Sequence, residues 1–545
     1  MKHIEKNRWL RPTFWLVISL LGLWTAAAAT PGEARPNIVC ILCDDLGYGD
    51  VHCLNPARGK IPTPSLDRLA TQGMTLTDAH STSAVCTPSR YSLLTGRYNW
   101  RSRLQRGVLS SYGKSLIAED RLTVARLLRQ QGYDTACMGK WHLGWNWPGK
   151  GRDIDFTKPI KGGPTAVGFD YYFGVDGPNG PPYCFIENEH TVGIPNIPLP
   201  QRLIGNNLAS EPGPSVPGWK LEEIVPTITG KACDFIARRA NTGKPFFLYL
   251  AMPAPHTPIA PNQDWRGKSG LGAYGDYVME TDWAIGRVLA ALDQSGAGTN
   301  TLVLVSSDNG AAPYVGVGPE QLKQLEAKGF DPQTAEKGGF KRFKELEAMG
   351  HFSSADFRGH KSDIWDGGHR VPTFVRWPGK VQPGSTSGQL ISLVDFMATC
   401  ADILQVQLPP NAAEDSVSIL PVLQGNATGP IHEAVVFHSI FGSFAIQQAN
   451  WKLELCSGSG GWGEPKSNAK LPAVQLYDVG KDIGEQTNEY ASHPEVVARL
   501  TKLLEKYVAD GRTTPGLVQH NDAPINLWKD KRPPGDNSEK NNVHE

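Results

Sequence analysis

The chain has 545 residues, of which 40% are hydrophobic and 20% are charged. That length suits one large α/β domain plus a smaller one, and excludes a single small domain. The composition is that of an ordinary globular protein, and basic and acidic residues are equal in number at 54 each, which excludes disordered and strongly basic classes.

The first 28 residues have the pattern of an export signal. A basic start, MKHIEKNRWLR, precedes the apolar run FWLVISLLGLW and the small residues TAAAAT, with a cleavage site near Ala28. The alternative is a membrane anchor, but the run is short for a span of about 20 residues. We therefore expect cleavage, export to the periplasm or the exterior, and no stable membrane span afterwards. Because the segment carries four basic residues and one acidic residue, the mature chain has a formal charge of −3, which argues against a nucleic-acid partner.

Strand-like and helix-like segments then alternate. Buried strands are predicted within 36–45, 133–142, 244–256 and 301–309, and helices within 64–73, 122–132, 228–240 and 281–296. Apolar strands alternating with amphipathic helices predict an α/β fold with a large, mostly parallel sheet between helices. Ligands of such sheets bind at the carboxyl ends of the strands.

Acidic and amide side chains follow two of these strands. Asp44 and Asp45 end the first strand, and Asp308 and Asn309 follow the last. Either group alone could simply form a turn. Together, carboxylates that would otherwise repel one another predict a cation, and an all-oxygen set favours Ca²⁺ or Mg²⁺ over Zn²⁺.

Basic side chains form a second set of candidate site residues, opposite in charge to the acidic strand ends. Lys140, His142, His256 and Lys361 lie in loop contexts rich in glycine and proline, and Arg90 is a further candidate. Any one histidine could be an ordinary core or surface residue. Together with a divalent cation, these groups would stabilise charge on a transferred sulfuryl or phosphoryl group. The sequence therefore predicts a metal-dependent ester hydrolase.

The stretch CTPSRYSLLTGR, residues 86–97, resembles the hallmark motif of the type I sulfatases of the alkaline phosphatase-like superfamily. GKWHLG (139–144) and LYDVGKDIGEQTNEY (476–490) resemble two further family motifs, so the similarity spans about residues 35–490. The nearest likeness is to bacterial arylsulfatases and N-acetylgalactosamine-6-sulfatases. The resemblance implies an alkaline phosphatase-like fold with a smaller C-terminal α+β domain.

The resemblance also explains why a cysteine opens the motif. In this family a formylglycine-generating maturase oxidises that residue, here Cys86, to Cα-formylglycine. One hydroxyl of the hydrated aldehyde attacks sulfur and forms a covalent sulfate ester. The other then loses its proton, and sulfate is expelled.

The resemblance to the sulfatase motifs also implies roles for further residues of this sequence. The ion is expected to be one Ca²⁺ rather than Mg²⁺, bound by Asp44, Asp45, Asp308, Asn309 and the modified Cys86. Arg90 would hold the diol, and Lys140 would contact both diol and sulfate. His142 would be the base and His256 the acid for the leaving alcohol. His256 and Lys361 would bind sulfate oxygens.

The expected substrate is a sulfated carbohydrate of the galactose or N-acetylgalactosamine type. Candidate sugar contacts are Trp365, Asp366, His369 and Arg370, unless they only shape the loop that carries Lys361. The charged stretch 313–357 is either a surface helix or a lid. Three alternatives remain: a phosphomonoester or phosphonate ester hydrolase of the same superfamily, a non-catalytic sulfated-glycan-binding protein, and a thiol enzyme that uses unmodified Cys86.

The expected organisation is a signal peptide (1–28), a catalytic domain (35–430), a C-terminal subdomain with an antiparallel sheet and a helix (431–525) and a mobile tail (526–545). Apart from Cys86, eight cysteines remain, and export invites disulfides between them. Cys40 and Cys43, inside an apolar strand, are equally consistent with buried thiols.

Overall fold

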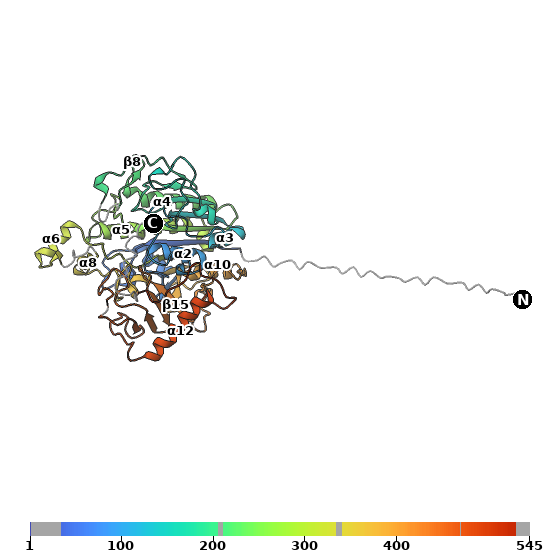
Figure 1. The fold of residues 1–545 in the computed structure, drawn as a ribbon. Coiled ribbons are helices and arrows are strands. Elements are labelled where there is room, and N and C mark those ends of the chain that lie inside the picture. Colours follow the sequence, from blue (N-terminus) through green and yellow to red (C-terminus); the bar gives the residue numbers. More distant parts are fainter. Residues whose placement is uncertain (2–33, 205–210, 334–339, 469, 530–545) are drawn as a thin grey trace. The chain divides into compact units, whose positions relative to one another are not determined.

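The computed structural model describes residues 1, 34–204, 211–333, 340–468 and 470–529. The chain divides into two units, 1–34 and 35–545, and everything below concerns the second (Figure 1). The predicted signal peptide, apart from Met1, and residues 530–545 of the predicted tail lie outside the described residues. Within the described part, no helix combines the length and the apolar character that crossing a membrane requires.

A ten-stranded sheet forms the centre of the fold. Its five middle strands run parallel, and antiparallel strands extend it on both sides, so the prediction of a large, mostly parallel sheet is confirmed. In spatial order the strands are β13 (Ser385–Ser387), β2 (Met74–Leu76), β12 (Phe374–Arg376), β11 (Thr301–Ser307), β1 (Asn37–Asp44), β10 (Phe246–Pro255), β4 (Asp134–Lys140), β5 (Tyr171–Val175), β6 (Ile186–Glu187) and β7 (His190–Thr191).

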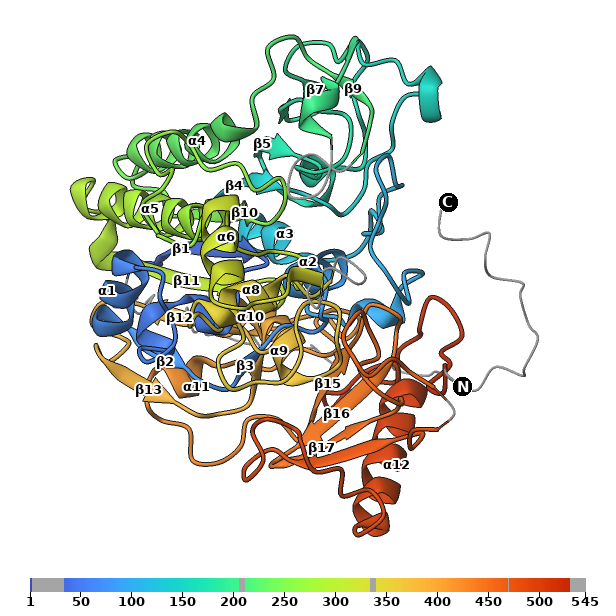
Figure 2. The ribbon, with the colours of Figure 1, turned by 90° about the vertical axis from the view of Figure 1, so that its left-hand side faces the viewer.

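Helices cover both faces of this sheet (Figure 2). Alternate residues of β1 belong to opposite cores: Cys40 and Leu42 pack with one set of helices, and Val39 and Ile41 with the other. The first set includes α2 (Cys86–Thr95), α3 (Val124–Gln130), α10 (Phe396–Ile403) and α11 (Leu420–Leu423). The second set includes α1 (Pro64–Gln72), α4 (Ile224–Arg239), α5 (Ala273–Gln294), α6 (Pro319–Ala327) and α8 (Phe343–Ala348).

A separate antiparallel sheet forms the C-terminal part, as predicted. Its four strands are β15 (Val435–His438), β16 (Phe444–Gln448), β17 (Trp451–Glu454) and β18 (Gln475–Asp478). Helix α12 (Pro494–Asp510) packs on one face of it, and the segment before the short helix α9 (Asp366–His369) packs on the other. Leu527, within the predicted tail, belongs to the α12 side of this core. Two small strand pairs complete the fold: β3 (Ala79–His80) with β14 (Ile391–Ser392), and β8 (Ile197–Pro198) with β9 (Pro214–Ser215).

The expectation of disulfides is wrong: none of the nine cysteines, all within the described residues, forms one. Cys40 and Cys43 lie in β1 and are fully buried. Most of the other cysteines are also buried, and a buried thiol packs as a small apolar side chain.

Candidate active site

The polar residues predicted from the strand ends gather at one edge of the sheet. Four neighbouring strands, β11, β1, β10 and β4, are parallel and end on the same side. In that order they lead to Asp308, Asp44, His256 and Lys140. Cys86 opens α2, and Lys361 lies on the loop before α9.

Unusual backbone conformations aim these side chains. Asp45 has a φ of 66° and His142 a φ of 52°, in the left-handed region that most residues avoid. Consecutive strand residues normally point to opposite faces, so the turn at Asp45 lets both Asp44 and Asp45 face the site. Gly139 in β4 is required by packing, because a Cβ there would lie 1.9 Å from the carbonyl oxygen of Ala251.

Arg90 links the two acidic strand ends. Its Nε and Nη2 donate to Oδ2 of Asp308 at 2.9 and 2.7 Å, and Nη2 lies 3.5 Å from Asp44 Oδ1. Its Nη1 donates to the carbonyl oxygen of Lys140 at 3.1 Å, and Lys140 Nζ lies 2.8 Å from Asp44 Oδ2. All four side chains are fully buried.

Asp45 is the centre of a second group. Lys361 Nζ donates to it at 2.8 Å, and the side-chain amide of Asn309 donates to Asp45 Oδ1 at 2.7 Å. Tyr314 also donates its hydroxyl to Asp45 Oδ2 at 3.2 Å, and His256 Nε2 lies 3.7 Å from the same oxygen.

Several oxygen atoms between these groups fit a cation. Both carboxylate oxygens of Asp44 and the amide oxygen of Asn309 are buried and accept no hydrogen bond from the described residues, although Lys140 pairs with Asp44 by charge. Ligand atoms of Asp44, Cys86 and Asp308 lie within 4.8 Å of one another. Unsatisfied buried oxygens are costly, and hard oxygen donors suit Ca²⁺ or Mg²⁺.

The pKa values of Asp308 and Asp44 are shifted in opposite directions. Burial and the nearby Asp44 carboxylate raise the pKa of Asp308 well above its usual value. Burial also opposes ionisation of Asp44, but the positive charges around it, Lys140 first and Arg90 among them, outweigh it and hold the pKa of Asp44 well below its usual value. A bound cation would favour the ionised form of both groups.

Cys86 faces a histidine whose tautomer is fixed. His142 Nε2 lies 2.9 Å from the carbonyl oxygen of Leu109, so it is the nitrogen that carries the proton, and Nδ1 lies 3.2 Å from Cys86 Sγ as an acceptor. Burial, together with Lys140, lowers the pKa of His142 to about 3. The imidazole is therefore neutral near pH 7, with Nδ1 able to take a proton from a group at position 86.

His256 is turned the opposite way. Its Nδ1 lies 2.5 Å from the carbonyl oxygen of Thr257, which assigns the proton to Nδ1. Burial, together with Lys361, lowers the pKa of His256 to about 4. Nε2, directed toward Asp45, must gain a proton before it can act as an acid.

The charges of the cluster balance. When Asp308 is ionised, as a bound cation would favour, three carboxylates (Asp44, Asp45 and Asp308) face Arg90, Lys140 and Lys361, while both histidines are neutral. A divalent cation would make the site positive by two charges, which favours an anionic substrate.

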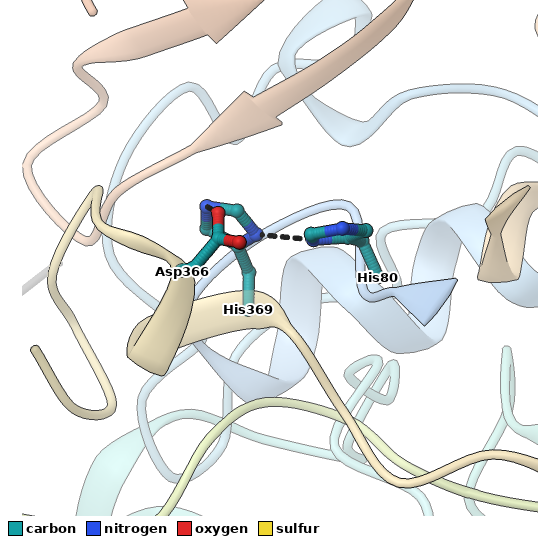
Figure 3. Close-up of side chains that lie close together, drawn as sticks. All are labelled: His80, Asp366 and His369. Carbon is teal, nitrogen blue, oxygen red and sulfur yellow. Dashed lines mark hydrogen bonds and ion pairs between the residues drawn. The ribbon is translucent and has the colours of Figure 1, made fainter. Parts of the chain in front are cut away.

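The candidate sugar contacts around α9 need correction. Trp365, Asp366 and His369 are each at most 1% exposed, so no surface remains for a sugar. His369 Nδ1 lies 3.0 Å from His80 Nδ1 (Figure 3). Arg370 is largely buried and donates to the carbonyl oxygen of Thr77. These residues shape the loop that carries Lys361.

His80, Asp366 and His369 could by spacing hold a metal ion, but a lysine already lies there. Lys452 Nζ, from β17, lies 2.8 Å from Asp366 Oδ1, 3.2 Å from His369 Nε2 and 2.7 Å from Glu485 Oε1. The ammonium group supplies the positive charge that a metal would bring, so this cluster is a structural one.

Sequence reasoning missed Tyr314, whose hydroxyl contacts both Asp45 and Lys361. Its position five residues after Asn309 was the available signal. In the same charged stretch, α8 buries Glu345 and Leu346 and leaves Lys344 and Ala348 exposed.

Comparison with known proteins identifies relatives along most of the chain. A family model described as Sulfatase matches residues 36–406. N-acetylgalactosamine-6-O-sulfatase of Bacteroides thetaiotaomicron is 34% identical over 508 residues, which cover 86% of this chain and 93% of that protein. Arylsulfatase A of Bos taurus is 32% identical over 505 residues, covering 89% and 90%. A solved structure from work on the metabolism of multiple glycosaminoglycans by Bacteroides thetaiotaomicron is 32% identical with a TM-score of 0.74, covering 87% and 99%.

Proposed function

Since the chain belongs to the sulfatase family and is a sulfuric ester hydrolase, we propose that it hydrolyses sulfate esters on a carbohydrate of the galactose or N-acetylgalactosamine type. The name of the N-acetylgalactosamine-6-O-sulfatase relative supports this substrate class. The observation that carries the proposal is the position of Cys86, 3.2 Å from the acceptor nitrogen of His142 and beside a charge-balanced cluster of acids and bases.

One Ca²⁺ is the cofactor that we propose for the acidic strand ends. Asp44, Asp45, Asp308 and Asn309 would hold it together with residue 86. The unsatisfied buried oxygen atoms of Asp44 and Asn309 support this assignment. The ion would supply positive charge against the negative charge that develops on the sulfuryl group.

We also propose that a maturase converts Cys86 to formylglycine. Addition of water to its aldehyde would give a diol with two hydroxyl groups, one as nucleophile and one for releasing sulfate. His142 Nδ1 would take the proton of the second hydroxyl. Lys140, His256 and Lys361 would bind sulfate oxygens, and protonated His256 Nε2 would donate to the leaving alcohol. Arg90, held by Asp308, would orient the group at position 86.

Export and maturation complete the proposal. The signal-like sequence of residues 1–28 supports secretion or delivery to the periplasm, where polymeric carbohydrate is encountered. The partners are the sulfated carbohydrate and a formylglycine-generating maturase.

The test is sulfate release by protein produced together with such a maturase, with conversion of Cys86 checked by peptide mass. The panel contains 4-O- and 6-O-sulfated galactose and N-acetylgalactosamine, sulfated glucosamine, an aryl sulfate and an aryl phosphate, with Cys86→Ala as the control. Release from a sulfated galactose or N-acetylgalactosamine is expected. Release from the aryl phosphate alone would refute the proposal. No release by fully converted protein would favour a glycan-binding protein.

A further inference from the structure

Three aromatic side chains from separate parts of the chain meet beside Lys361. Tyr314 follows β11, Phe340 lies before α8, and Trp462 lies on the loop between β17 and β18. The rings of Phe340 and Trp462 are stacked with centroids 4.8 Å apart, and Tyr314 lies 6.3 Å from each. The three rings therefore form one continuous aromatic group.

This group leads from the surface to the charged site. Phe340 is 38% exposed, and Tyr314 and Trp462 are partly exposed. At the inner end, the Tyr314 hydroxyl lies 3.4 Å from Lys361 Nζ and 3.2 Å from Asp45 Oδ2. Lys361 and His256 keep exposures of 4% and 6%, whereas Asp44, Arg90, Lys140 and Asp308 have none. His142, next to Cys86, is also partly exposed. The aromatic group therefore lies at one of the places where the site meets solvent.

The loop that carries Trp462 is fixed to the loop that carries Lys361. The backbone N–H of Trp462 donates to Ser362 Oγ at 2.8 Å, and that of Gly463 donates to Asp363 Oδ1 at 2.7 Å. A Cβ on Gly461 would lie 2.3 Å from the carbonyl oxygen of Ser362, so the two loops touch backbone to backbone. The indole is thus held in place relative to Lys361 before any ligand arrives.

We propose that Tyr314, Phe340 and Trp462 form an aromatic subsite on which a pyranose ring of the sulfated carbohydrate packs, next to Lys361. This inference rests on the proposed function. Carbohydrate sites need an apolar surface for the C–H face of the sugar beside a few polar groups that fix its orientation. Exposed aromatic rings held rigidly beside a cationic anion-binding group provide both.

The test compares Trp462→Ala and Phe340→Ala with wild type, all with Cys86 converted. The expected result is a rise of about tenfold in KM for the preferred sulfated sugar, from losing contact with one large ring, and little change in kcat. Trp462→Phe should restore most of the affinity. The matched control is Trp451→Ala: Trp451 is also partly buried in the C-terminal sheet, but it packs against His493. Thermal unfolding of every variant separates loss of binding from loss of fold.

Failure of the subsite is distinguishable from failure of the proposed function. If wild type cleaves the sugar and neither alanine variant changes its KM, the subsite is refuted while the function stands. If wild type cleaves no sulfated sugar, calorimetric titration of N-acetylgalactosamine 6-sulfate into Cys86→Ala and into Cys86→Ala with Trp462→Ala decides. Weaker binding by the double variant supports the subsite, and equal or absent binding overturns it.

Discussion

Replacing Lys452 with methionine tests how much the ion pairs between the C-terminal sheet and the loop that carries Lys361 contribute to the free energy of unfolding. Lys452 is fully buried, and its single ammonium faces three carboxylates: Asp366 at 2.8 Å, Glu485 at 2.7 Å and Glu454 at 3.4 Å. Methionine keeps most of the volume but removes the charge. Breaking a buried pair by removing one partner costs about 3–5 kcal/mol, because an uncompensated charge stays buried. We expect a loss of that size in the free energy of unfolding.

The assay is urea unfolding followed by circular dichroism at about pH 8 and about pH 5. In the variant, burial without the ammonium raises the pKa of the carboxyl groups, so folding takes up protons and stability falls as pH rises. The difference in the free energy of unfolding between variant and wild type should therefore be smaller at about pH 5 than at about pH 8. Lys481→Met is the control, since Lys481 pairs with Asp478 at the surface, and it should leave the midpoint unchanged. A loss below about 1 kcal/mol at pH 8, within the range of a surface pair, would refute the reasoning.

Three further predictions concern the site and the core. Cys86→Ala should abolish sulfate release but keep Ca²⁺ binding, measured by calorimetry. Cys86→Ser should accumulate a sulfated protein that mass spectrometry detects. Steady turnover by the serine variant would contradict the proposed role of two hydroxyls. Removing the proposed Ca²⁺ with a chelator should lower the midpoint temperature of unfolding, and added Ca²⁺ should restore that midpoint better than Mg²⁺. An unchanged midpoint would argue against a resident ion. Burial raises the pKa of Glu280 to about 7, so the energy that favours its neutral form is lost as pH rises through 7. Glu280→Gln should therefore gain up to about 3 kcal/mol over wild type at pH 8 and much less at pH 5 by urea unfolding, and an equal effect at both pH values would contradict this account.

The polar residues at the strand ends could be predicted because the local sequence alone shows both the strand and the residues that follow it. Each buried strand is a short apolar run, and the rule that ligands bind at the carboxyl ends of parallel strands brings residues such as Asp44 and Asp308 together without coordinates. The helix start at residue 281 was less accurate. α5 begins at Ala273, because Tyr274 and Tyr277 are buried by tertiary packing that the local pattern does not reveal.

The errors have the same origin. His369 resembles a site residue in the local sequence GGHR, but its direction is set by His80, 289 positions away, and by Lys452 of the C-terminal sheet. The antiparallel strands that flank the parallel centre of the sheet, β12 and β6, depend likewise on pairing that the local sequence does not reveal. The cysteines resemble a disulfide set by count alone, whereas pairing requires proximity that only the fold decides.

The C-terminal sheet takes part in building the active site, because it holds the Lys361 loop from two directions. Lys452 of β17 binds the carbonyl oxygen of Ile364 and the carboxylate of Asp366. The loop after β17 binds Ser362 and Asp363 through the backbone of Trp462 and Gly463. Ser362 itself has a φ of 88°, a conformation that surrounding contacts must maintain. Lys361 therefore keeps its position beside Asp45 through contacts from residues about 90–100 positions later in the chain. Removing the C-terminal sheet would release the loop that carries this amine.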